Sequence, residues 1–304
     1  MAPMMGYTDC YFRSLSHNLF PNEFETISEM IVDKALIYNE KKTISQHFLP
    51  SNKSAIQIAG SEPTEIRQAV KILNEIEIIN HVNFNLGCPS SRVQENNLGL
   101  ALTQNFKLVK QCLEELVKYK KKISVKCRLG LGLEEDKQYI FDYLDLFDEI
   151  GIKTVFIHCR NGILNLDTKK NRSIPKINYD LFLECKKFNP KLNLIPNGEI
   201  NEKRVFDYFL QYDVKNFMIG RQFTKDLLFL EKIGLIKKNN INAAIQNFLD
   251  EIKIHKNLNI NLIKKSLFTI LSHVPHSKIY KRELEQLQTL AEISQYFESR
   301  SIWN

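Results

Sequence analysis

The sequence predicts an α/β protein in which a (β/α)8 barrel, the TIM-barrel fold, is followed by a smaller C-terminal helical domain. Two observations carry this prediction. Short apolar runs rich in β-branched residues alternate with helical patterns along the first 230 residues. Such alternation is typical of a parallel sheet, and eight strand–helix units close most economically into a barrel, with an open doubly wound sheet as the alternative. After Arg221 the strand-like runs stop and helical patterns continue alone.

Eight runs are expected to form the strands, the first of them being short. They are Met1–Met4, Phe24–Ile27, Ala55–Ala59, Val82–Leu86, Ile123–Cys127, Thr154–Ile157, Leu192–Ile195 and Phe217–Ile219. Apolar residues three and four positions apart predict the helices. These are Pro63–Ile78, Asn105–Lys120, Tyr139–Ile150 and Val205–Leu210 between the strands, and Ala243–Ile254, Leu262–Leu271 and Lys281–Phe297 in the tail. The predicted domains are therefore residues 1–230 and 231–304.

Composition excludes several classes of protein. The chain has 304 residues, 43% hydrophobic and 25% charged, which is typical of an ordinary globular protein. Six cysteines without a CxxC pair indicate free thiols in a reducing compartment and no metal site. The sequence shows no signal peptide and no apolar run long enough for a membrane span, so we expect a cytoplasmic protein. Of the net charge of +7, more than half lies in residues 231–304, which suggests an anionic partner.

Polar residues gather where the predicted strands end, which in a barrel is the rim that carries the chemistry. A buried polar side chain needs a partner, so one at the end of each of six strands is hard to explain by structure alone. The residues concerned are Gln57, Asn85, Lys126, Arg128, His158, Arg160, Asn197, Gly198, Gly220 and Arg221.

Three of these strand ends suggest specific chemistry. Gly198 and Gly220 end consecutive strands, where barrels often bind a phosphate on backbone N–H groups, and Arg221 adds a positive charge. Lys126 is a cation suited to a cofactor whose reduced form is anionic, such as a flavin, although a surface lysine fits the spacing equally well. Cys88 lies on a turn between Gly87 and Pro89, where a thiol can act as nucleophile or proton donor.

The chain resembles the tRNA-dihydrouridine synthases, a family of flavin enzymes that reduce a uridine in the D-loop of tRNA. The resemblance rests on strings such as Asn85-Leu86-Gly87-Cys88-Pro89-Ser90, followed by Lys126-Cys127-Arg128-Leu129-Gly130. Ala2-Pro3-Met4, Gln57-Ile58-Ala59-Gly60, His158-Cys159-Arg160, Asn197-Gly198-Glu199-Ile200 and Gly220-Arg221 also match. The stretches after Cys88 and after the sixth strand are similar to the bacterial DusA-like branch, which acts at D-loop positions 20 and 20a.

The resemblance implies a role for each matching residue. FMN would be held by Ala2, Pro3, Met4, Gln57, Lys126, His158, Asn197, Gly198, Glu199, Gly220 and Arg221. NADPH would reduce the flavin, hydride would pass from flavin N5 to C6 of the uracil, and Cys88 would protonate C5. The flipped base would contact Asn85, Arg128 and Arg160, while Arg92, Arg172 and the basic tail would hold the tRNA backbone. We expect a monomer.

Some positions depart from the family pattern, notably Asn96 and Leu100 in the loop after Cys88, and Gln222 beside the expected phosphate site. Two other functions are therefore weighed. One is an FMN-dependent barrel oxidoreductase acting on a free pyrimidine, against which the basic tail and the Arg172 loop argue. The other is a non-catalytic RNA-binding or folding module that has kept the barrel.

Overall fold

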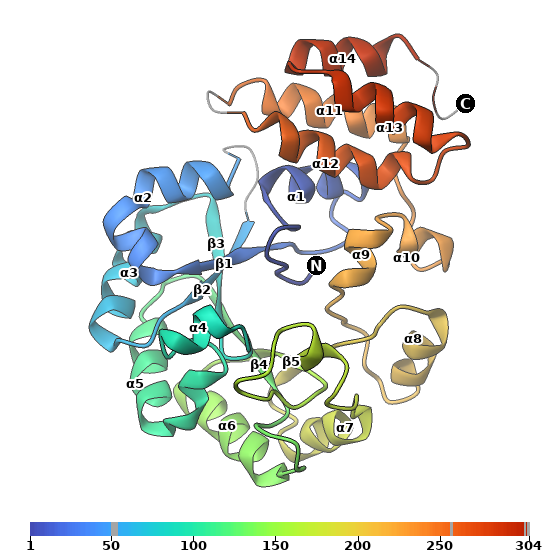
Figure 1. The fold of residues 1–304 in the computed structure, drawn as a ribbon. Helices are drawn as coiled ribbons and strands as arrows, with labels where there is room; N and C mark the ends of the chain where they lie inside the picture. The colour runs from blue at the N-terminus through green and yellow to red at the C-terminus, as the bar shows by residue number, and fades with distance from the viewer. Residues whose placement is uncertain (50–53, 256–257, 301, 303–304) are drawn as a thin grey trace. The chain divides into compact units, whose positions relative to one another are not determined.

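The computed structural model describes residues 1–49, 54–255, 258–300 and 302, and its centre is a six-stranded sheet. The strands follow one another across the sheet in chain order, and each pair of neighbours from β2 to β6 is parallel (Figure 1). The strands are β1 (Ile27–Val32), β2 (Ser54–Ala59), β3 (Ile79–Asn85), β4 (Lys122–Arg128), β5 (Thr154–His158) and β6 (Asn193–Asn197).

Helices connect successive strands, as parallel pairing requires. They are α2 (Asp33–His47), α3 (Pro63–Glu75), α4 (Ser91–Glu95), η1 (Ala101–Gln104), α5 (Phe106–Leu116), α6 (Lys137–Ile150), η2 (Lys170–Arg172) and α7 (Tyr179–Phe188). One more helix, α8 (Lys203–Leu210), follows the last strand. Several begin at a side-chain cap: Asn105 accepts a hydrogen bond from Leu108 N, and Asp136 accepts from Tyr139 N. Their apolar faces, such as Val109, Leu113 and Leu116 of α5, are fully buried.

Two of the eight expected strands do not form among the described residues, and a third is misplaced. Met1–Met4 is irregular backbone, and at Phe217–Ile219 only Met218 makes an isolated parallel bridge, to Asn197. The second strand begins at Ile27, where the expected run ended, and continues to Val32. The reason is visible in β1, because Ser28 and Glu29 interrupt its apolar pattern although both are buried.

The C-terminal region is helical, as predicted, with α9 (Arg221–Lys225), α10 (Phe229–Lys232), α11 (Ile241–Ile252), α12 (Ile260–Leu271), α13 (Ser277–Gln286) and α14 (Leu290–Glu298). The single helix expected over Lys281–Phe297 is two helices. A capping box explains the break, since Thr289 accepts from Glu292 N while Glu292 accepts from Thr289 N.

Two compact units make up the structure, and they differ from the two predicted domains. Unit 1 comprises residues 1–29, 45–52 and 220–304, and unit 2 comprises residues 30–44 and 53–219. In unit 1, the N-terminal helix α1 (Cys10–Leu19) packs on α11 and α12. The N-terminal segment thus shares a core with the helical tail, and the boundary at residue 230 stays a prediction.

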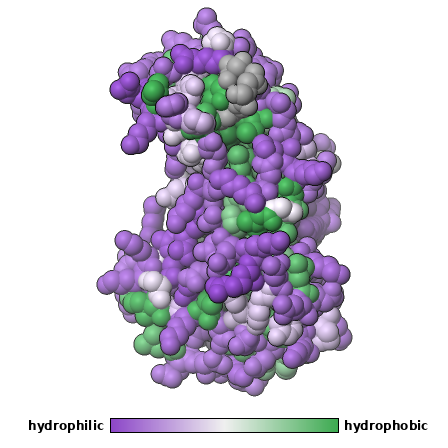
Figure 2. Space-filling view, turned by 90° about the vertical axis from the view of Figure 1, so that its right-hand side faces the viewer, coloured by the Kyte–Doolittle hydropathy of each residue, from purple (hydrophilic) through white to green (hydrophobic). Residues whose placement is uncertain are grey.

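Figure 2 shows one face of the molecule, on which hydrophilic residues dominate and hydrophobic ones form separate patches. Large exposed hydrophobic side chains are scattered along the chain, among them Met5, Tyr38, Leu133 and Ile254. Within the described residues, no helix combines the length and apolarity needed to cross a bilayer.

Candidate active site

A chain of buried amide side chains links β2, β3 and β4 in unit 2. Gln57 Nε2 donates to Asn83 Oδ1 at 2.6 Å, and Asn85 Nδ2 donates to Gln57 Oε1 at 2.8 Å. Asn83 Nδ2 donates to Ser124 Oγ at 2.8 Å, and His81 Nε2 lies 2.6 Å from the same hydroxyl. All five side chains are buried, so each polar group depends on the others.

The sequence prediction included Gln57 and Asn85 but missed His81, Asn83 and Ser124. The signal was present, since His81, Asn83 and Asn85 alternate with Val82 and Phe84, and residues two apart on a strand point to the same face. Strand register completes the arrangement by pairing Gln57 with Asn83 and Asn83 with Ser124. A polar layer of this kind fixes the side chains at the ends of the strands.

Cys88 lies on a turn that Asn85 stabilises. Asn85 Oδ1 accepts from Gly87 N at 3.1 Å and from Cys88 N at 2.9 Å, so the end of β3 positions the cysteine directly. The Cys88 thiol is partly exposed and has Ser90 Oγ 3.6 Å away. It packs beside the apolar cluster of Ala59, Val93 and Leu98.

The loop after Cys88 closes back on the cysteine despite its departures from the family pattern. Leu100 N donates to Cys88 O at 3.1 Å, and Leu100 is fully buried. Gly99 has φ +59, and a Cβ there would lie 2.8 Å from Cys88 O and 3.2 Å from Asn85 Oδ1. Glycine at this position therefore lets the loop approach the cysteine. Asn96 lies outside this contact and donates from its side chain to Arg92 O.

The other five cysteines differ from Cys88 in being buried. Burial raises the pKa of Cys10 to about 11 and that of Cys112, Cys127 and Cys159 to about 12, and it raises the pKa of Cys185 further still. A thiol with such a pKa stays protonated and unreactive near neutral pH. Cys88 is thus the one partly exposed thiol of the six.

Lys126 and Arg128 lie two residues apart on β4 but have different surroundings. Arg128 donates from Nε to Gly87 O at 2.9 Å and from Nη1 to Asn161 O at 2.8 Å and Asn171 O at 3.3 Å. The ammonium group of Lys126 has no hydrogen-bond or ion-pair partner among the described residues. Burial, with a contribution from the nearby Arg128 charge, lowers the pKa of Lys126 to about 8. Arg128 is therefore tied to three loop carbonyls, whereas Lys126 is a free cation.

The ends of β5 and β6 meet closely. His158 and Asn197 are register partners, and Asn197 Nδ2 donates to Met218 O at 2.7 Å. Gly198 has φ +114, and a Cβ there would lie 2.7 Å from Cδ2 of the His158 ring. Only glycine fits this position, so the backbone after β6 passes directly against the histidine.

Arg160 is buried and held by two partners. Its guanidinium donates to Pro175 O and forms an ion pair with Glu199, whose side chain is 44% exposed. Glu199 has φ +51, a left-handed conformation that costs a non-glycine residue free energy. The ion pair accounts for an acidic residue at this strained position.

The two arginines expected to contact the tRNA backbone lie on short helical segments of unit 2. Arg92 is exposed on α4, and Arg172 is partly buried in η2. The loop that carries Arg172 is anchored by fully buried Asn171, whose side chain bonds the backbone of Ile163 and Leu166. The sequence prediction missed Asn171, and no pattern around it marks it as an anchor.

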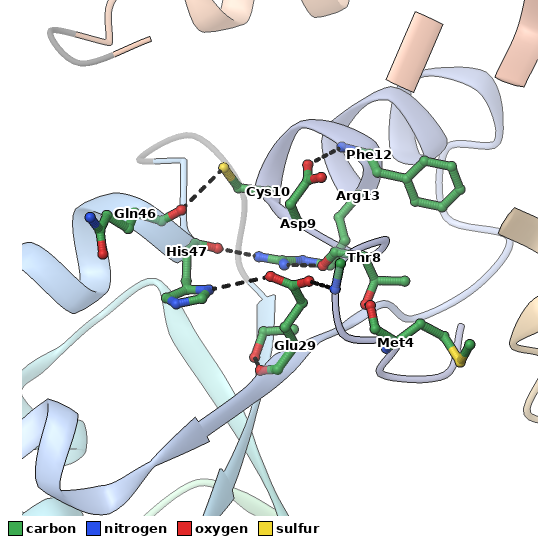
Figure 3. Close-up of polar contacts among 11 residues, drawn as sticks. Met4, Thr8, Asp9, Cys10, Phe12, Arg13, Glu29, Gln46 and His47 are labelled. Atoms are coloured by element: carbon green, nitrogen blue, oxygen red, sulfur yellow. Dashed lines mark hydrogen bonds and ion pairs between the residues drawn. The ribbon is translucent and has the colours of Figure 1, made fainter. Parts of the chain in front are cut away.

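The remaining cofactor candidates belong to unit 1, and a network of polar contacts holds the first of them (Figure 3). Met4 N donates to Thr8 Oγ1 at 2.8 Å, and Gly6 N donates to Glu29 Oε1 at 2.5 Å. Buried Arg13 donates to Thr8 O at 2.8 Å and His47 O at 2.6 Å. This network fixes the backbone from Met4 to Thr8, at the end of the Ala2-Pro3-Met4 string and just after it.

Gly220 contacts the same string within unit 1. A Cβ at Gly220 would lie 3.1 Å from Met4 Sδ and 3.3 Å from Ala2 Cβ. Arg221 is exposed and begins α9, with Gln222 next to it. The structure thus brings Ala2, Met4 and Gly220 together in unit 1. The residues from Gln57 to Glu199 belong to unit 2.

No cluster of three or more His, Cys, Asp or Glu side chains that could hold a metal ion occurs in the part of the chain that the structure describes.

Comparison with solved structures identifies the fold. Morphinone reductase superimposes with a TM-score of 0.51 at 10% sequence identity, covering 80% of this chain and 88% of that one. A complex of a morphinone reductase variant with tetrahydroNAD gives a TM-score of 0.52 over a similar share. Together with the parallel sheet and its alternating helices, this likeness confirms the predicted TIM-barrel class with a helical C-terminal region.

Comparison with curated sequences points to one family. A tRNA-dihydrouridine(20/20a) synthase from Xylella fastidiosa is 28% identical over 297 residues, covering 94% of this chain and 86% of that protein. The synthase of the same name from a Synechocystis species is 26% identical over 302 residues, covering 96% and 89%. The family described as dihydrouridine synthase (Dus) matches residues 1–302. Since that match takes in both units and every strand-end residue above, the chain belongs to the dihydrouridine synthase family.

Proposed function

We propose that this protein is a flavin-dependent oxidoreductase that reduces the C5=C6 bond of D-loop uridines in tRNA, at positions 20 and 20a, with FMN as cofactor and NADPH as electron donor. The observation that carries the proposal is the Cys88 turn, in which a partly exposed thiol is fixed by Asn85 beside the uncompensated cation Lys126. The relatives named tRNA-dihydrouridine(20/20a) synthase align over most of both chains.

The residues present fit a flavin. An ammonium that is partly withdrawn from water and has no protein partner is costly, and the partly buried Lys126 is such a group. An anionic ligand would offset that cost, and reduced FMN is anionic. When bound, FMN supplies the hydride that reaches the uracil ring and NADPH replenishes it. Gln57, Lys126 and His158 would hold the ring system or its side arm.

The phosphate of FMN would lie against backbone that approaches closely. Gly198 supports this assignment in unit 2, because no side chain is possible beside His158. We propose the same role for Asn197 and Glu199 of unit 2. For unit 1 we propose phosphate contacts by Gly220 and Arg221, and contacts with the flavin ring by Ala2, Pro3 and Met4. Arg221 contributes charge to the phosphate contacts.

Cys88 acts as the general acid in this proposal. Its thiol proton passes to C5 of the uracil as C6 receives hydride, and solvent restores the thiol. General acid catalysis of this type contributes about 10²- to 10⁴-fold to a rate. Asn85, Arg128 and Arg160 would orient the flipped base. The backbone bonds of Arg128 and the ion pair of Arg160 make both of them rigid rather than adaptable contacts.

Arg92, Arg172 and the basic helical tail would bind tRNA phosphates, because Arg92 is exposed and neither arginine side chain has a partner among the described residues. We further propose a cytoplasmic monomer, in keeping with six free thiols, and a functional division at residue 230. These assignments rest on charge, exposure and chain position.

Deletion of the gene, followed by mapping of dihydrouridine in cellular tRNA, tests the function. We expect positions 20 and 20a to lose the modification and the wild-type gene to restore it. The Cys88→Ala gene should fail to restore it although the variant protein folds and binds FMN. Unchanged tRNA in the deletion strain would refute the proposed function. Full rescue by Cys88→Ala would refute the role of the thiol.

A further inference from the structure

Unit 1 contains a pocket that the proposed reaction does not use. Its volume is about 210 Å³, and it is built from the loop after Met4, the first turn of α1, and parts of α9, α12 and α13. All of its lining residues belong to unit 1. Its lining includes Tyr7, Asp9, Lys225, Lys265, Phe268 and Lys281. We call this feature the lysine pocket.

Three ammonium groups and one carboxylate give the lysine pocket a positive balance. Lys265 Nζ donates to Gly6 O, and Lys281 Nζ donates to Ser272 Oγ at 2.5 Å. None of the three lysines forms an ion pair with a carboxylate among the described residues.

Some other lysines of unit 1 are paired, since Lys232 pairs with Asp226, Lys238 with Glu231 and Lys253 with Asp250. Lys237, Lys264 and Lys278 have no carboxylate partner among the described residues either. The pocket lysines differ from them in lining one cavity together, where a single anion could contact all three. Three flexible ammonium groups suit a phosphate, which accepts several charge-assisted hydrogen bonds.

Aromatic rings add a second kind of recognition. Tyr7 lines the pocket with 47% of its surface exposed, and Lys265 Nζ lies 4.6 Å from the centre of its ring. Phe268 lines the pocket from α12 and is partly buried. Exposed aromatic rings next to cations are the usual platform on which nucleic-acid bases stack.

The size of the pocket limits the ligand. Pockets that enclose a drug-sized molecule measure about 300–1,000 Å³. At about 210 Å³ the lysine pocket lies below that range, so it would enclose part of one nucleotide and is too small for a whole dinucleotide.

We propose that the lysine pocket binds a single nucleotide unit, with its phosphate held by Lys225, Lys265 and Lys281 and its base against Tyr7 and Phe268. The unit is either a free mononucleotide or one residue of an RNA strand. The RNA alternative rests on the proposed function, in which the basic helical tail that includes Lys265 and Lys281 binds tRNA, whereas the free mononucleotide does not. Both are tested by binding alone, without the reductase reaction.

Isothermal titration of the full-length protein with AMP tests the proposal. We expect AMP to bind more tightly than either inorganic phosphate or adenosine. Lys265→Ala and Lys281→Ala should each weaken AMP binding about 10-fold or more, the effect of losing one charge-assisted hydrogen bond. Lys278→Ala is the matched control, because Lys278 is exposed on the same helix as Lys281 and does not line the pocket. It should change AMP affinity by less than about 2-fold.

The aromatic part of the proposal has its own variants. Tyr7→Ala should weaken AMP binding while Tyr7→Phe retains it, since stacking needs the ring and not the hydroxyl. Circular dichroism melting of each variant verifies that folding is unchanged.

Competition identifies the source of the nucleotide. If a five-residue oligoribonucleotide displaces AMP and loses affinity in Lys265→Ala, the pocket takes one residue of an RNA strand. If AMP binds and the oligonucleotide leaves it in place, the ligand is a free mononucleotide. Phosphate that binds as tightly as AMP, AMP affinity unchanged by Lys265→Ala, or no AMP binding at millimolar concentration would each overturn the proposal.

Discussion

Polar side chains lie close together both at the strand ends of unit 2 and in the lysine pocket of unit 1. The two regions differ in whether other groups of the protein bond to those side chains. In unit 2, Gln57, Asn83 and Asn85 bond to one another, and Arg128 is bound to three loop carbonyls. In unit 1, the pocket lysines have no carboxylate partner among the described residues. The first arrangement holds side chains in position before a ligand arrives. The second leaves charge available for an anion that the protein does not supply.

Lys126 is the exception in unit 2, because its ammonium group is not bonded to another protein group. Its replacement should have the largest effect of the changes considered, and that effect is on the rate of tRNA reduction. Lys126→Met removes the partnerless cation while keeping most of the side-chain volume. We expect reduction of tRNA to slow by about 10²- to 10³-fold, the scale of losing one preorganised electrostatic contact. Steady-state assays with unmodified tRNA measure this. Activity within a few-fold of wild type would mean that Lys126 has no part in the reaction.

The same variant should be more stable than the wild type in the flavin-free state. The pKa of Lys126 falls from 10.5 to about 8 on folding, so the unfolded chain binds its proton more tightly. The free energy of unfolding should therefore rise as pH increases from about 8 to 10.5, and the cost of the buried charge, on the order of 3 kcal/mol, applies in full below pH 8. Denaturant melts of both proteins across this range give the difference. If the wild type were more stable than Lys126→Met at pH 7, the charge of Lys126 would not be destabilising in the flavin-free protein.

Arg128 is hydrogen-bonded within the protein, so its replacement should lower stability, whereas replacement of Lys126 should raise it. Arg128→Met leaves the carbonyls of Gly87, Asn161 and Asn171 without their donor, which should cost about 2–4 kcal/mol of stability. Arg92→Met is the control, since Arg92 is exposed, and should change stability by less than about 0.5 kcal/mol. Thermal melts compare the two. Equal melting temperatures would show that the carbonyl contacts of Arg128 contribute nothing.

Substitutions of Glu199 should have the smallest effect on stability. A comparison of two of them distinguishes the contribution of the ion pair from that of backbone strain. Glu199→Ala and Glu199→Gly both remove the partner of Arg160, and each should lower stability by up to about 2 kcal/mol. Glycine adopts φ +51 without cost, so the glycine variant should be the more stable of the two by about 1 kcal/mol. Urea titrations resolve this difference. An alanine variant as stable as the glycine variant would argue against strain at this residue.

Much of the fold was predictable because it is encoded locally. Apolar runs located β2 to β6, and helical periodicity located α3, α5, α6 and α12. The grouping of α1 with α11 and α12 was not predictable, since it depends on packing between segments more than 200 residues apart. Thr289 and Glu292 are a capping signal for the start of α14, but the apolar pattern continues across the break and predicted a single helix.

Prediction of the site succeeded in choosing positions and failed in describing their surroundings. Polar residues at strand ends led to Gln57, Asn85, Cys88 and Lys126. Arg128 is bound to loop carbonyls and Lys126 is not. This difference depends on the path of loops far along the chain, which the spacing of residues within β4 does not reveal. The roles given to these residues toward FMN and tRNA stay predictions.

The central claim is that a flavin held by this chain passes its electrons to tRNA, with Cys88 as proton donor. An anaerobic half-reaction tests it most directly. The protein is loaded with FMN, reduced with one equivalent of NADPH, and mixed with tRNA that lacks dihydrouridine while absorbance near the flavin band is followed. We predict that tRNA restores the oxidised spectrum in the wild type and yields dihydrouridine, while Cys88→Ala stays reduced. Reduced flavin that persists with tRNA but is oxidised by free uridine would contradict the account.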